Sequence, residues 1–278
     1  MPPAELADWM RAARSGSLIL HPRDGLTVLP GLGLDTEILV SVTGTMARVK
    51  VRQRFANPTA SWVEGIYVFP LPEDAAVDQM RILTDGRVIE GQIQEKEQAR
   101  KNYEAAKKQG RRAGLVEQQR SNVFTTSIAN IRPRSEVTVE IEYQQSVRLD
   151  DGEFSLRVPT VVAPRFMPGE TEAVARPATH RIEIDVDLAP GFDLDRLESP
   201  YHPIVIFDDG HTYGVSLAEG PILADRDFVL QWRPAPGLEP EAVVFSETLG
   251  GHSYALIMVT PPSVEAAAQT ALRRTDST

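Results

Sequence analysis

The sequence predicts a mainly β protein, with an antiparallel β-sandwich domain that carries one inserted α-helix and a second β-rich, sandwich-like module after it. Three observations lead to this prediction. Apolar and polar residues alternate with a period of two along most of the chain, as in strands with one buried face. Turn dipeptides separate these short segments at intervals of roughly ten residues. One segment of helical periodicity interrupts the rhythm.

Two segments show the alternation most clearly. In residues 47–54 the odd positions are apolar, and the even positions carry the cations Arg48, Lys50, Arg52 and Arg54. In residues 137–147 the odd positions are again mostly apolar, whereas the even positions include Glu140 and Glu142. We expect these strands to be neighbours, with cross-strand charge pairs worth roughly 0.2–1 kcal/mol each. The alternative is that the cations form a basic ligand-binding stripe.

Further strands are expected on both sides of this pair. Asp85-Gly86, Asp209-Gly210 and Gly250-Gly251 are turn dipeptides that each join two apolar segments into a hairpin. From Pro261 onward the chain lacks an adequate apolar face, and we interpret it as a tail or linker. The remaining expected strands are residues 62–69, 80–84, 87–93, 124–131, 154–158, 182–188, 204–207, 213–217, 228–232, 243–247 and 254–259.

One helix is expected over residues 94–109, because Ala99, Tyr103 and Ala106 fall on one helical face and Gly110 suits the helix end. A cluster of cations lies at this end. It could bind a polyanion, a sulfated glycan or an acidic partner, and the alternative is an ordinary solvated helix end. The candidate polyanion or partner patch consists of Lys107, Lys108, Arg111 and Arg112.

Composition excludes several classes of protein. The 278 residues have 29 basic and 39 acidic side chains, a net charge of −10 and no cysteine. Without cysteine there is no disulfide scaffold, thiolate zinc site or thiol nucleophile. The negative charge argues against nucleic acid as a partner. No apolar stretch reaches the ~20 residues of a membrane-spanning helix, and the first residues do not form a signal peptide.

No catalytic constellation and no cofactor motif are found, so the sequence predicts neither catalytic residues, nor a cofactor, nor a metal site. His202 and His211 flank the Asp209-Gly210 hairpin and, with Asp208, form the one arrangement considered for a weak metal site. The alternative is that both are ordinary solvated loop histidines. Acidic pairs such as Asp150-Asp151 are expected to form turns rather than calcium sites, since no EF-hand-like spacing follows.

A spaced series of residues resembles a known domain. It includes Phe55, Asn57, Glu64, Tyr67, the run Phe69-Pro70-Leu71-Pro72, Gly86, Ile89, Gly91, Glu95-Lys96, Ala99, Tyr103, Ala106, Gly110, Ala113, Leu115, Phe124 and Ile131-Arg132-Pro133. The series is similar to the VIT domain (vault protein inter-alpha-trypsin domain). The wider chain resembles the amino-terminal part of bacterial proteins related to inter-alpha-trypsin inhibitor heavy chains, some of them sortase-target proteins of proteobacteria.

The resemblance implies a non-enzymatic interaction or scaffold module that makes protein–protein or adhesion contacts in a secreted or cell-surface protein. Two departures limit it. The Pro-Gly turn of the family is Pro133-Arg134 here. No Asp-x-Ser-x-Ser motif of a von Willebrand A domain occurs, so no metal-ligand role is carried over. The alternatives are a polyanion- or glycan-binding module and a hydrolase with an unrecognised site.

The expected organisation has five parts. They are an N-terminal extension (1–24), a VIT domain (25–150), a connection (151–178), a second β-rich module (179–260) and a tail or linker (261–278).

Overall fold

The structure, a computed structural model, describes residues 16–22, 29–72, 74–91, 114–120, 123–160, 181–223, 225–235 and 241–260. All regular elements within these ranges are strands, which confirms the mainly β fold. The expected helix at 94–109 lies outside the described residues. The strands are β1 (Ser17–Pro22), β2 (Leu29–Pro30), β3 (Leu32–Thr43), β4 (Met46–Ala56), β5 (Val63–Pro70), β6 (Ala76–Thr84), β7 (Arg87–Glu90), β8 (Gly114–Arg120), β9 (Val123–Ile131), β10 (Glu136–Ser146), β11 (Arg148–Asp150), β12 (Glu153–Val158), β13 (Arg181–Ala189), β14 (Leu194–Glu198), β15 (Ile204–Asp208), β16 (Tyr213–Leu217), β17 (Ile222–Leu223), β18 (Phe228–Pro234), β19 (Glu241–Leu249) and β20 (His252–Thr260).

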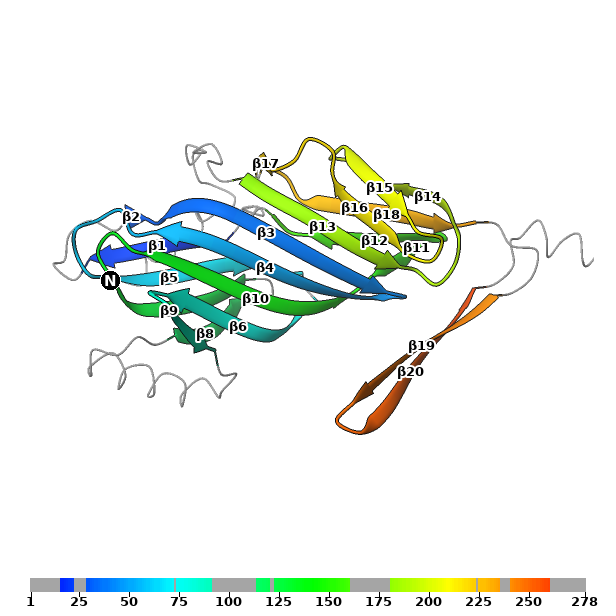
Figure 1. Cartoon of the computed structure of the whole chain (residues 1–278), viewed down its shortest axis with the longest axis horizontal. Helices are drawn as coiled ribbons and strands as arrows, with labels where there is room; N and C mark the ends of the chain where they lie inside the picture. Colours follow the sequence, from blue (N-terminus) through cyan, green and yellow to red (C-terminus); the bar gives the residue numbers. More distant parts are fainter. Residues whose placement is uncertain are drawn as a thin grey trace, which may run out of the picture.

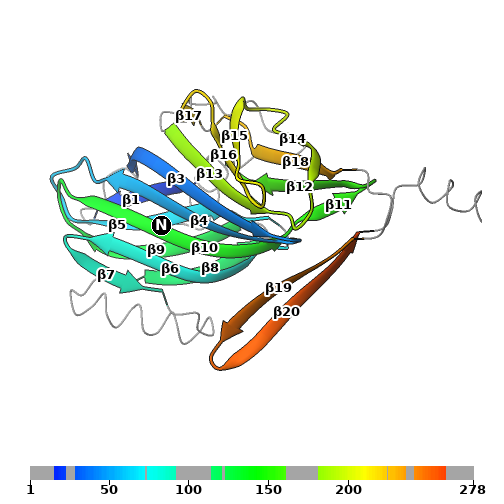
Figure 2. The same cartoon turned by 45° about the vertical axis from the view of Figure 1, so that its right-hand side comes forward.

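One long sheet organises the molecule. Its nine strands run in the order β15-β16-β13-β3-β4-β10-β6-β7, with β17 attached to β13. A five-stranded sheet of order β2-β1-β5-β9-β8 lies behind β3, β4, β10 and β6 (Figure 1). A four-stranded sheet of order β11-β12-β18-β14 lies beside β13. The β19–β20 hairpin forms a separate two-stranded sheet that projects from the layers (Figure 2).

The expected pairing of the two most regular strands is confirmed. β10 runs antiparallel to β4, with Glu140 opposite Arg52 and Glu142 opposite Lys50. The odd-numbered apolar side chains of both strands point into the sandwich, where Val49, Val51 and Ile141 are fully buried. Because side chains alternate between faces, the same register places all the cations of β4 on the outer face.

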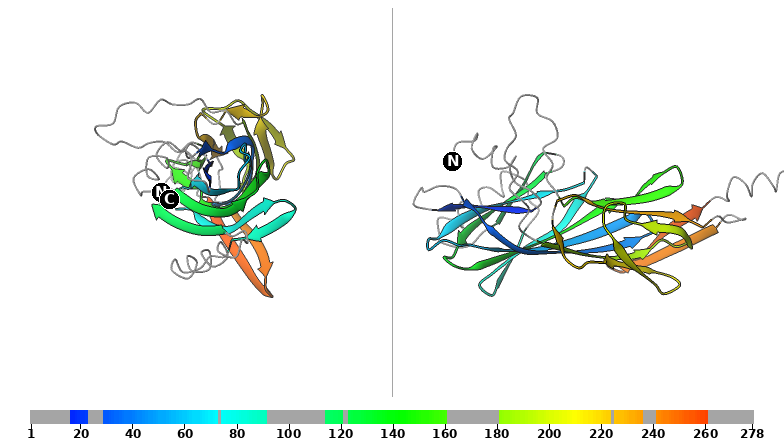
Figure 3. Two further views of the ribbon diagram at one scale, coloured as in Figure 1. Left: turned by 90° about the vertical axis from the view of Figure 1, so that its left-hand side faces the viewer. Right: turned by 90° about the horizontal axis from the view of Figure 1, so that it is seen from above.

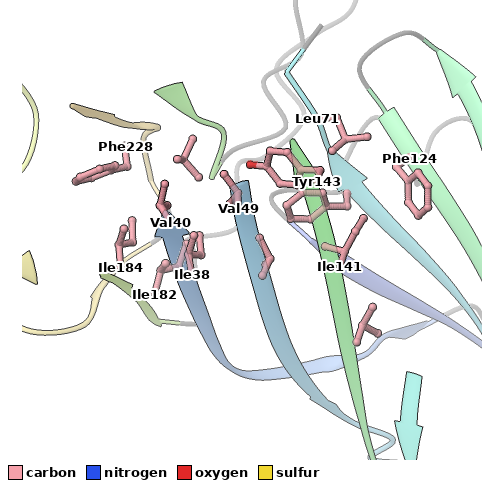
Figure 4. Packing of buried hydrophobic residues seen from close by; sticks show 14 of the residues in the cluster. Ile38, Val40, Val49, Leu71, Phe124, Ile141, Tyr143, Ile182, Ile184 and Phe228 are labelled. Carbon is pink, nitrogen blue, oxygen red and sulfur yellow. The ribbon is translucent and has the colours of Figure 1, made fainter. Parts of the chain in front are cut away.

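A parallel pair joins the two halves of the chain, and the sequence did not predict it. β13 lies parallel to β3, with Ile184 beside Ile38 and Val186 beside Val40. These side chains and the buried face of β18 belong to one continuous apolar cluster. Figure 4 shows Phe228 on this side of the core, near Ile184 and Val40. The sheets of both halves therefore share a single core.

The turn dipeptides behave as expected. Asp85 and Gly86 have φ values of 46° and 72° and connect β6 to β7, as a type I′ hairpin turn requires. The hairpins β15–β16 and β19–β20 are also confirmed. At the turn before β10, Arg134 has a φ of 53°, so an arginine takes the left-handed conformation that the family pattern gives to glycine.

Candidate interaction surfaces

The outer face of the nine-stranded sheet carries the cations of β4, and each of them contacts an acid. Arg48 lies 3.0 Å from Asp78 and 3.7 Å from Glu142, which is also 3.8 Å from Lys50. Arg52 lies 3.6 Å from Glu140. Since these cations are 40–53% exposed, each pair stabilises the fold by less than about 1 kcal/mol. Paired cations on a sheet favour the structural role over a free basic stripe.

A shallow groove of about 490 Å³ lies on this face where β3, β4 and β13 meet. Its lining carries both signs of charge, and Arg54 donates hydrogen bonds from Nε to both carboxylate oxygens of Asp35 at 2.9 and 3.0 Å. The groove is lined by Leu34, Asp35, Thr36, Glu37, Arg52, Arg54, Arg181, Glu183 and Pro221. Within the described part of the chain, no group of three or more acids and histidines is placed to hold a metal ion.

His202 and His211 do not form a joint site, because they lie at opposite ends of β15. His202 is only 6% exposed, and its ring packs against Phe228 at a tilt of 32°, with centroids 5.8 Å apart. Burial lowers the pKa of His202, the Arg226 charge lowers it further, and Asp225 opposes the shift. His211 is an exposed residue of the hairpin turn.

Asp209 shapes this turn, in agreement with the predicted role of the acidic pairs. Its carboxylate accepts hydrogen bonds from the backbone N–H groups of Thr212 at 2.7 Å and His211 at 3.0 Å. These bonds favour the charged form and lower the pKa of Asp209. The Asp209 carboxylate therefore stabilises the turn by accepting these hydrogen bonds.

The β19–β20 hairpin presents the largest group of exposed apolar side chains in the described residues. One face contacts the rest of the molecule, because the Phe245 ring packs against the turn glycines Gly44 and Gly191. We call the opposite face, with Val244, Ile257 and Val259, the hairpin outer face. These three side chains are 60%, 66% and 62% exposed. The view along the long axis shows the hairpin pointing away from the sheets (Figure 3).

The predicted cationic patch of Lys107, Lys108, Arg111 and Arg112 lies outside the described residues and stays a prediction.

Sequence reasoning missed several buried polar groups. The hydroxyl of Tyr143 and Nε1 of Trp232 are buried and have no hydrogen-bond partner among the described residues. Periodicity identifies such residues as core, but it carries no signal for what their polar atoms meet.

The strand order, the shared core and the exposed hairpin define an all-β module without a recognisable reaction centre among its described residues. Comparison with known proteins shows what the chain is similar to. Residues 34–143 match the family model described as Vault protein inter-alpha-trypsin domain. The match includes β3, β4, β5, β6 and β10. The resemblance seen in the sequence is confirmed.

Three curated relatives extend the match. Von Willebrand factor A domain-containing protein 5A from Rattus norvegicus is 29% identical over 210 residues, which are 69% of this chain and 25% of that protein. Protein mono-ADP-ribosyltransferase PARP4 from Mus musculus is 36% identical over 60% of this chain and 8% of that protein. Inter-alpha-trypsin inhibitor heavy chain H3 from Bos taurus is 31% identical over 51% of this chain and 16% of that protein.

The chain thus spans a quarter or less of the length of these relatives. Among solved structures, a putative nutrient binding protein from Legionella pneumophila shares 10% identity and a TM-score of 0.43, over 81% of this chain and 72% of that one. A similarity of this size carries no argument about function. No helix among the described residues is long and apolar enough to cross a membrane.

Proposed function

We propose that the chain is a non-enzymatic interaction module that makes protein–protein contacts, and that the hairpin outer face is its main contact surface. The exposed apolar side chains of this face carry the proposal. A two-stranded hairpin is marginally stable in water, and exposed apolar groups of this kind mark sites of protein association. The VIT domain at 34–143 supports the same role.

The construction of the hairpin fits this role. Phe245 holds its inner face against the turns that end β3 and β13, so the strands keep a defined position. On the outer face, Val244 lies directly opposite Ile257 in the ladder, and Val259 follows on the same face. These adjacent side chains form an apolar patch that a folded partner can cover.

We propose that the partner is a folded domain of a longer, secreted or surface-associated protein. A von Willebrand A domain is the candidate, because one relative is named for such a domain. Adhesion would then depend on that domain, while this chain positions it. Protease accessibility on intact cells that produce the protein tests the proposed location.

Photocrosslinking tests the contact surface. Benzoylphenylalanine replaces Val244 in cells that produce the chain, and replaces Val88 in the control. Val88 is 58% exposed on β7, at the far edge of the nine-stranded sheet. We expect one protein segment to crosslink from position 244 but not from position 88. The paired substitution Val244→Asp with Ile257→Asp should weaken binding of that purified partner at least about tenfold.

The crosslinked segment also shows whether the partner is a von Willebrand A domain or another protein. A crosslink into a von Willebrand A domain supports both the interaction role and the domain partner. A crosslink into another protein keeps the interaction role and overturns the domain partner. Equal crosslinking from both positions, together with substrate turnover by the purified chain, overturns the interaction role itself.

A further inference from the structure

One edge of the nine-stranded sheet is unusually apolar. β15 pairs with β16 on one side, and no described strand pairs with its other side. Its first four residues, Ile204 to Phe207, are apolar. Val205, Ile206 and Phe207 are 57%, 42% and 72% exposed, so side chains on both faces of the strand are in contact with solvent.

Four other edges of the three multistranded sheets are protected by charge or by shortness, within the part of the chain that the structure describes. Charged residues on an edge strand discourage pairing with another chain. β2 has two residues, one of them proline. The charged residues on the remaining three edges are Arg87 and Glu90 on β7, Arg148 and Asp150 on β11, and Asp195, Arg196 and Glu198 on β14.

The backbone register shows which hydrogen-bonding groups reach this open edge. Backbone groups along an antiparallel strand point alternately toward and away from the paired strand. Pro203 accepts a bond from the N–H of Ala218, and Asp209 donates one to Thr212, so these two residues face the β16 side. The even-numbered residues between them therefore direct their N–H and C=O groups outward. These are Ile204, Ile206 and Asp208.

The hairpin that carries this edge is acidic. Asp208 ends β15, Asp209 follows it in the turn, and the hairpin from Ile204 to Leu217 contains no lysine or arginine. A second copy of this chain, with a net charge of −10, would bring like charges together. A strand that carries basic residues would meet opposite charge instead.

We propose that the open edge of β15 is a strand-addition site for an extended peptide segment with alternating apolar residues and terminal basic residues. Main-chain hydrogen bonds to Ile204, Ile206 and Asp208 would hold the segment as an additional strand of the sheet. Its apolar side chains would cover Val205 and Phe207, and its basic residues would lie near Asp208 and Asp209 at the end of β15. This is the recognition mode of β-augmentation, in which backbone bonds give affinity and side chains give selectivity.

Fluorescence anisotropy with the full chain tests the site. The probes are two short peptides of alternating valine and threonine, one ending in lysines and one ending in glutamates. We expect the lysine peptide to bind at least about threefold more tightly than the glutamate peptide at low salt, and this preference to shrink at high salt.

Two variants locate the binding, and one serves as a matched control. Val205→Lys places a charge on the edge, and Ile206→Pro removes an N–H that points outward while leaving the bonds to β16. Each substitution should weaken binding of the lysine peptide at least about tenfold. Val88→Lys changes the same residue type at nearly equal exposure on the opposite edge and should leave binding unchanged. Thermal melts confirm that all three variants fold.

Each contrary outcome is informative. Equal binding by wild type, Val205→Lys and Ile206→Pro would place the peptide elsewhere and overturn the proposal, as would an absence of binding. If wild type sediments as a dimer and Val205→Lys as a monomer, the occupant is a second copy instead of a basic segment. The site is independent of the hairpin outer face, so Val244→Asp with Ile257→Asp should not affect peptide binding.

Discussion

The hydroxyl of Tyr67 donates a hydrogen bond of 2.5 Å to Oε1 of Gln53, and the two residues come from opposite sheets of the VIT sandwich. Gln53 in turn donates from Nε2 to the hydroxyl of Thr36 at 2.9 Å. All three side chains are buried. The polar groups therefore satisfy one another inside an apolar core, where an unmatched group would be costly.

Tyr67→Phe should lower the free energy of unfolding by about 1–3 kcal/mol, because it leaves the buried Oε1 of Gln53 without its donor. Tyr143→Phe is the matched control. Tyr143 is equally buried, but its hydroxyl has no hydrogen-bond partner in the part of the chain that the structure describes, and it points away from Leu71 and Phe124 (Figure 4). Its removal should be neutral or stabilising. Urea denaturation measures both, and an equal loss in the two variants would contradict this account.

Glu142→Lys should cost about 1 kcal/mol of stability, because Glu142 contacts both Arg48 and Lys50 on the neighbouring strand. The loss should become smaller at high salt, and adding Lys50→Glu should recover part of it. Glu247→Lys on the hairpin is the control, at an exposed strand position that makes no ion pair with any described residue. Denaturation at two salt concentrations distinguishes the cases, and a salt-independent loss at Glu142 would rule out an electrostatic cause.

Gly191→Ala should release the hairpin from the rest of the molecule. Gly191 has a φ of 85°, and an added methyl group would stand 2.7 Å from Cζ of Phe245. Gly220→Ala imposes a similar backbone strain at a φ of 70° but meets no atom within 4 Å. Hydrogen exchange should therefore accelerate in β19 and β20 only for Gly191→Ala. Equal acceleration in both variants would show that backbone strain, and not the Phe245 contact, is responsible.

Arg134→Gly should raise the free energy of unfolding by up to about 1 kcal/mol. The left-handed conformation of Arg134, with its φ of 53°, costs a side-chain-bearing residue about 1–2 kcal/mol, and the added flexibility of glycine in the unfolded chain offsets part of the gain. Arg132→Gly in the same turn is the control and should be destabilising, since Arg132 has no positive φ. Thermal denaturation measures both, and a loss in Arg134→Gly would show that the arginine side chain stabilises the turn.

Stability should fall as the pH is lowered through about 6.5, because the pKa of His202 is below its ordinary value of 6.5 in the folded protein. The unfolded chain takes up a proton at His202 first, so protonation favours unfolding until the folded-state pKa is reached. His202→Leu should reduce the loss between about pH 7.5 and about pH 5.5. Part of the loss should remain, because burial also lowers the pKa of His21. His211→Leu, at an exposed turn position, should keep the wild-type slope in urea denaturation, and an unchanged slope in His202→Leu would contradict the assignment.

Much of the fold could be predicted from the sequence because the alternating pattern of a strand is visible within a short stretch of residues. The alternation in 47–54 and 137–147 identified the buried face of β4 and β10, and their opposite charges indicated the pairing. Dipeptides such as Asp85-Gly86 marked hairpins, since few residue pairs accept two positive φ values. The surfaces proposed for binding could not be predicted from the sequence. Nothing in the residues Ile204 to Phe207 distinguishes an exposed edge strand from a buried one.

The sequence by itself determined the β class and the buried face of each regular strand, because a period of two depends only on residues close together in the chain. The resemblance to the VIT domain was also visible in the sequence, in residues such as the run Phe69-Pro70-Leu71-Pro72. The tertiary structure decided which strands became neighbours. The parallel pairing of β13 with β3, the Tyr67–Gln53 bond between sheets and the open edge of β15 all arise from contacts between distant segments. Alternation specifies that a face is buried, but the choice of what covers it follows from packing in three dimensions.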